Sequence, residues 1–98
     1  MEEGIRISDR QFGRKIAKHA ADYGLEPNNP IHRAQLRHII EQIGTFPDAI
    51  VEGTFRGQGR VKFFIKGKDV VVTTLSNEFV TILKDGINNL SVRRALGK

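Results

Sequence analysis

The sequence predicts an α+β domain in which two N-terminal helices pack on a four-stranded antiparallel sheet. Apolar residues recur at helical spacing between about residues 8 and 43, whereas branched and aromatic residues fill glycine-punctuated segments between about 49 and 84. Consecutive strands joined by such tight turns form an antiparallel meander. We therefore expect a single domain over 1–98, with helices at about 8–43, the sheet at about 49–84 and a basic tail at 87–98.

The first expected helix begins at Ser8-Asp9 and ends at Gly24. Serine and aspartate are good N-cap residues, and glycine suits the left-handed position that follows a helix. At about 100° per residue, the apolar side chains of this segment form one narrow arc against the core. These side chains are Phe12, Ile16, Ala20 and Tyr23.

The second expected helix begins with Asn29 as N-cap and Pro30 in its first turn, and it runs to about Ile43. His32 and His38 lie on it without an evident partner, so we interpret them as exposed or boundary residues. The apolar stripe that faces the core consists of Leu36, Ile39, Ile40 and Ile43.

Four strands are expected at 49–56, 60–66, 70–75 and 79–83, with a hairpin loop at 57–59. Side chains alternate between the two faces of a strand, so we expect one face to pack under the helices and the other to face solvent or a ligand. The tail after Ile87 is either a short helix or a mobile basic end. The open face is expected to present Thr54, Arg56, Lys62 and Lys66, with Thr73 and Thr81 as further candidates.

Composition limits the classes of protein to which the chain can belong. The formal net charge of +5 favours a polyanionic partner, either nucleic acid or an acidic protein, although a merely soluble basic surface is the alternative. No apolar run is long enough to span a bilayer, so we expect no membrane embedding. The chain lacks cysteine and nucleotide-binding glycine motifs, and its three histidines lack carboxylates at metal-binding spacing. We expect neither a metal nor a cofactor.

The polar face of the first helix carries the candidate chemistry. His19 lies where the polar and apolar faces meet, with Lys15 and Lys18 beside it. Histidine can act as base or acid near neutral pH, and cations stabilise a pentavalent phosphate, so this set suits RNA cleavage without a metal. Arg56 and a threonine hydroxyl from the sheet would complete it. Asp22 either orients the imidazole or pairs with Lys18.

Several motifs resemble those of the colicin D type of bacterial toxin domain. The run from Lys15 to Gly24 resembles that family's Lys-Lys-x-Lys-His-Ala-x-Asp-Phe-Gly segment, with Tyr23 in the aromatic place and Arg14-Lys15 one position early. Residues 53–56 resemble its Gly-Thr-aromatic-Arg strand. Residues 78–81 resemble its Gly-x-Phe-Val-Ser strand, with Thr81 where a serine would stand.

This resemblance implies a metal-independent endoribonuclease that cleaves transfer RNA and belongs to the wider barnase, colicin and RelE-like group. It implies that such a domain is the C-terminal part of a larger secreted or contact-dependent toxin, acts in the target-cell cytoplasm and is neutralised by an acidic immunity protein. The catalytic residues implied are His19, Lys18, Lys15 and Thr81. The expected substrate-binding residues are Arg56, Thr54, Lys62 and Arg14.

Two functions of other classes remain open from the sequence. The basic sheet face suits a non-catalytic module that binds RNA or DNA, and the net charge equally suits a protein-interaction domain with an acidic partner. Phe63, Phe64 and Phe79 lie on basic strands, as in sheets that stack RNA bases, but the motif of that class is absent. We therefore expect these three aromatic residues to belong to the core.

Overall fold

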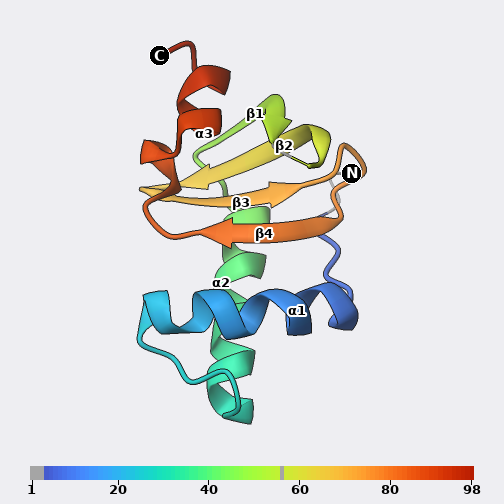
Figure 1. Cartoon of the computed structure of the whole chain (residues 1–98), viewed down its shortest axis with the longest axis vertical. Helices are drawn as coiled ribbons and strands as arrows, with labels where there is room; N and C mark the ends of the chain where they lie inside the picture. Colours follow the sequence, from blue (N-terminus) through green and yellow to red (C-terminus); the bar gives the residue numbers. More distant parts are fainter. Residues whose placement is uncertain (1–3, 56) are drawn as a thin grey trace.

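The computed structural model describes residues 4–55 and 57–98, which contain one four-stranded antiparallel sheet in the order β1-β2-β3-β4. Figure 1 shows α2 crossing one face of the sheet and α1 lying along its β4 edge. The predicted α+β class, with two N-terminal helices packed on this sheet, is confirmed. The elements are α1 (Asp9–His19), η1 (Ala20–Tyr23), α2 (Pro30–Thr45), β1 (Ala49–Phe55), β2 (Gly59–Lys66), β3 (Asp69–Thr73), β4 (Phe79–Leu83), η2 (Gly86–Asn88) and α3 (Leu90–Ala95).

The helix boundaries follow the capping residues of the sequence. Ser8 Oγ accepts a hydrogen bond from the Gln11 amide at 3.1 Å, and Asn29 Oδ1 accepts one from the Ile31 amide at 2.9 Å. Gly24 takes the predicted left-handed conformation with φ 69°. One detail of the prediction is wrong, because the α-helix ends at His19 and the chain continues to Tyr23 as a tighter 3₁₀ turn.

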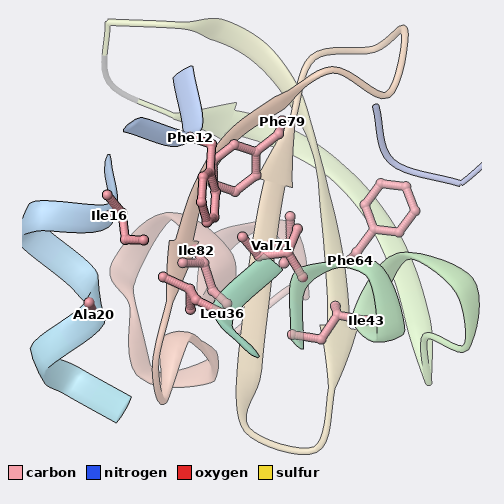
Figure 2. Close-up of a cluster of buried hydrophobic side chains, with 10 residues drawn as sticks. Phe12, Ile16, Ala20, Leu36, Ile43, Phe64, Val71, Phe79 and Ile82 are labelled. Carbon is pink, nitrogen blue, oxygen red and sulfur yellow. The ribbon is translucent and has the colours of Figure 1, made fainter. Parts of the chain in front are cut away.

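Two hydrophobic clusters lie on opposite faces of the sheet. The cluster in Figure 2 joins α1 and α2 to sheet residues that include Phe64, Val71 and Phe79. The second cluster joins α3 to Val61 and Phe63. The two N-terminal helices therefore pack on the face that carries Phe64, not on the more continuously apolar face of β2. All three aromatic residues expected in the core are buried, at 0% exposure for Phe63, 2% for Phe64 and 4% for Phe79.

The basic tail contains a helix that covers the second face of the sheet. Val92 of α3 is fully buried, and a Cβ atom added to Gly53 on β1 would lie 2.8 Å from Ala95 Cβ. Of the two conformations left open for the tail, the short helix is the one observed. The expectation of one open face is wrong, because α1 and α2 pack on the face of β2 that carries Phe64 together with Lys62 and Lys66, and α3 packs on the other face. Thr73 and Thr81, the further candidates, are 0% and 3% exposed.

The β4 edge of the sheet is covered by segments from the N-terminal part of the chain. Arg6 pairs with the beginning of this edge, where its amide donates to the Asn77 carbonyl and its carbonyl accepts from the Phe79 amide. Farther along, Gln11 Nε2 on α1 donates to the Val80 carbonyl at 2.6 Å. These contacts satisfy backbone groups that an uncovered edge strand would leave unpaired, and they fix α1 against β4.

Candidate functional site

His19 is the last residue of α1 and lies between that helix and β4. Nε2 of its ring is 3.0 Å from Thr81 Oγ1, and Nδ1 is 3.4 Å from Asp22 Oδ2 in η1. Only 11% of the side chain is exposed, so the ring is buried more deeply than its position between the two helix faces predicts. Contacts on both sides hold the imidazole in one orientation.

Asp22 determines which ring nitrogen carries the proton when His19 is neutral. A carboxylate only accepts hydrogen bonds, so Nδ1–H donates to Asp22. Nε2 then carries the lone pair and accepts from the Thr81 hydroxyl. Of the two roles left open for Asp22, the geometry favours orientation of the ring, since no ion pair joins Asp22 to Lys18 within the described ranges.

Burial lowers the pKa of His19 below its usual value of 6.5. The hydrogen bond from the ring to Asp22 and the carboxylate charge oppose this change, whereas the positive charges of Lys18 and Lys15 add to it. The neutral imidazole is therefore the favoured form at pH 7. A neutral ring with a lone pair on Nε2 can accept a proton from a hydroxyl group.

The structure brings the four residues that the sequence analysis selected as catalytic close to one another. Lys15 and Lys18 lie on α1 near enough to act on the His19 charge, and Thr81 contacts the ring directly. Lys18 is exposed and Lys15 is half-buried, and both act electrostatically on the buried imidazole. This arrangement suits an anionic ligand that reaches His19 from the α1 side.

Two of the residues selected for substrate binding, Thr54 and Lys62, lie on strands other than the one that contacts His19. Thr54 lies on β1, and the strand order puts β1 and β4 at opposite edges of the sheet. Lys62 donates from Nζ to Asn77 Oδ1 at 2.9 Å and is half-buried. Arg14 is exposed on α1. Arg56 lies outside the described residues.

The other histidines have structural surroundings. His32 Nδ1 accepts a hydrogen bond from the Glu26 amide at 2.8 Å and thereby fixes the turn before α2, whereas His38 is exposed on that helix. Within residues 4–55 and 57–98, no three histidine, aspartate or glutamate side chains are grouped as metal ligands would be. Over the same ranges, none of the helices has both the length and the apolar character needed to cross a bilayer.

One neighbour of this site was missed by the sequence analysis. Lys84 follows the end of β4, and its Nζ lies 5.7 Å from the centre of the Tyr23 ring. Tyr23 is adjacent in sequence to Asp22, so the contact lies beside the His19 site. The spacing of residues along the chain contains no signal for it, because it joins two segments that only the packing of α1 against β4 brings together.

Comparison with known protein families, with curated proteins and with solved structures finds no match to this chain.

Proposed function

We propose that this chain is a metal-independent endoribonuclease toxin domain of the colicin D type that cleaves transfer RNA. The observation that carries this proposal is the 3.0 Å contact between His19 Nε2 and Thr81 Oγ1. The resemblance selected both residues from motifs far apart in the sequence, and they are neighbours in the fold. A neutral histidine whose Nε2 accepts from a hydroxyl group, together with two lysines, forms a set that suits cleavage of a phosphodiester bond.

In the proposed reaction, His19 Nε2 takes the proton of a ribose 2′-hydroxyl. The 2′-oxygen attacks the adjacent phosphorus, the bond from phosphorus to the 5′-oxygen breaks, and a 2′,3′-cyclic phosphate forms. The leaving 5′-oxygen takes up a proton from solvent water and becomes a hydroxyl, and the imidazolium of His19 returns its proton to solvent. No redox partner is required, and the lone pair on Nε2 is the group that starts the reaction.

The remaining residues support this chemistry in different ways. Asp22 positions the imidazole and stabilises the imidazolium that forms when the ring takes up a proton. Lys15 and Lys18 bind the phosphate and stabilise the negative charge on its equatorial oxygens. Thr81 holds Nε2 until the 2′-hydroxyl arrives, and its methyl group narrows the space around the reacting atoms relative to a serine.

The proposed biological setting follows from the resemblance and from the net charge of +5. The domain is delivered to a target cell as part of a larger secreted or cell-surface toxin and cleaves transfer RNA in the cytoplasm. An acidic immunity protein neutralises it in the producing cell. Charge complementarity would give such a partner fast, salt-sensitive association with the basic toxin domain.

A specific observation favours the competing function, a non-catalytic basic module that binds RNA or DNA. His19 is 9% exposed, and both ring nitrogens have partners within the protein, as they would in a histidine that only stabilises the fold. Under this alternative, the lysines on α1 would bind phosphates without any reaction at the ring.

The two functions are separated by incubating unfractionated transfer RNA with the protein and with His19→Ala in the presence of a chelator. We expect the wild-type protein to cleave the RNA and the variant to lose about 10²–10⁴ in rate. Binding of the RNA should survive the substitution, because the lysines remain. Intact RNA after incubation with a folded wild-type protein would contradict the ribonuclease and favour the binding module.

A further inference from the structure

Lys84 and Tyr23 form a cation–aromatic pair next to the His19 site. Lys84 Nζ lies 5.7 Å from the centre of the Tyr23 ring. Tyr23 directly follows Asp22, which contacts His19 Nδ1, and Lys84 lies three residues after Thr81, which contacts Nε2. The pair therefore joins the same two segments that hold the imidazole.

The Lys84 side chain is exposed and forms no ion pair within residues 4–55 and 57–98. A contact with the face of an aromatic ring restricts the ammonium group without using its N–H donors. These donors remain available to an anion. In contrast, Lys62 and Lys66 already donate to oxygen atoms of the protein, Asn77 Oδ1 and the Phe46 carbonyl.

The surroundings of Tyr23 are otherwise acidic. Its hydroxyl is buried and faces the Asp69 carboxylate without meeting the geometric limits of a hydrogen bond in the described structure. Burial and the nearby carboxylates of Asp69, Asp22 and Asp85 raise the pKa of this hydroxyl. These carboxylates repel a polyanion. The ammonium group of Lys84 offsets this repulsion and allows a phosphate to approach the site from the β4 side.

We infer that Lys84, held over the Tyr23 ring, binds a phosphate of the RNA next to the phosphate that is cleaved at His19. This inference rests on the proposed ribonuclease activity and extends it to a second phosphate. Lys15 and Lys18 on α1 and Lys84 after β4 then hold the RNA strand from two sides of the imidazole. A phosphate contact fixes the position of the strand without touching the reacting atoms.

The test measures cleavage and binding separately for Lys84→Gln, for Lys84→Arg and for Lys98→Gln. Lys98 is an exposed lysine at the C-terminus, which Figure 1 shows at the end of the molecule opposite α1, so it is a control for the loss of one charge. Cleavage kinetics use unfractionated transfer RNA with the otherwise wild-type protein. Binding uses the same RNA with each substitution combined with His19→Ala, over a series of KCl concentrations.

We expect Lys84→Gln to raise KM about 3–10-fold with kcat within twofold, and to reduce the slope of log K against log [KCl] by about 0.7–0.9, as loss of one phosphate contact requires. Lys84→Arg keeps the positive charge, so it should retain the wild-type KM and the wild-type slope. The inference is overturned if Lys84→Gln leaves KM and the slope unchanged, if it lowers kcat alone, or if Lys98→Gln has an equal effect. Absence of cleavage by the wild-type protein would contradict the proposed function, whereas the binding series would still test Lys84.

Discussion

Thr81 Oγ1 on β4 and His19 Nε2 at the end of α1 lie 3.0 Å apart, and this contact is buried. It joins an edge strand to the helix that covers that edge. A buried hydroxyl and a buried imidazole satisfy each other here, so the contact stabilises the fold in addition to any role in catalysis. Substitutions at this contact should therefore change both the stability of the fold and the properties of the imidazole.

Replacing Thr81 with valine keeps the shape of the side chain and removes its hydroxyl. Nε2 of His19 would then be buried without a partner, and we expect a loss of about 1–3 kcal/mol in the free energy of unfolding. Thr81→Ser keeps the hydroxyl, so its free energy of unfolding should fall less than that of the valine variant. Urea unfolding of the three proteins measures the difference, and equal stability of the valine variant and the wild-type protein would show that the contact contributes nothing.

The charges around His19 predict pKa changes of opposite sign in two variants. Asp22 raises the pKa of His19, so Asp22→Asn should lower it further, whereas Lys18 lowers that pKa, so Lys18→Gln should raise it. NMR titration of the imidazole signals measures both changes in the same experiment. A change in the same direction for both variants would mean that the substitutions alter the fold rather than the local field.

Stability should depend on pH through His19. Because the pKa of His19 is lowered on folding, the unfolded state binds more protons than the folded state between that lowered pKa and 6.5. The free energy of unfolding should therefore fall as the pH is lowered through this window. Thermal unfolding from pH 8 to pH 5 measures the loss, which should be smaller in His19→Gln. An equal loss in both proteins would exclude His19 as its cause.

Two helical glycines should respond in opposite ways to alanine. A Cβ atom at Gly13 of α1 would meet nothing within 4 Å, so Gly13→Ala should stabilise the protein by about 0.5–1 kcal/mol. At Gly44 of α2, a Cβ atom would lie 2.8 Å from Ile5 Cγ1, and we expect a net loss of about 1–3 kcal/mol. Midpoints of thermal unfolding test both values, and stabilisation by Gly44→Ala would show that the N-terminal segment adapts freely.

The local features of the fold were predictable because each depends on a few neighbouring residues. Ser8, Asn29 with Pro30, and Gly24 mark the helix ends by the hydrogen bonds and backbone angles that they allow. The first and last residues of β4 were predictable in the same way, from the short turns on either side of the strand. These signals act over three or four residues and do not depend on how the rest of the chain packs.

The features that were left open or wrong depend on packing between distant segments. The sequence left the tail open between a short helix and a mobile end, because α3 has only six residues and its stability comes from burying Val92 against the sheet. Thr81 was a candidate for the open face because its burial depends on α1, whose His19 packs against β4. Thr54 was selected by the alternation of side chains along its strand and by resemblance to the Gly-Thr-aromatic-Arg strand, although a meander separates β1 from β4 by two strands.

The chemical ends of cleaved RNA show whether His19 starts a cleavage reaction, because attack by a 2′-hydroxyl leaves a 2′,3′-cyclic phosphate and a 5′-hydroxyl. Transfer RNAs are mapped at nucleotide resolution from cells that briefly express the wild-type domain or His19→Ala. If His19 starts the cleavage, we expect new 5′-hydroxyl ends at a discrete position in transfer RNA with the wild-type domain and none with the variant. Equal ends with both proteins, or no new ends with a folded wild-type domain, would contradict it.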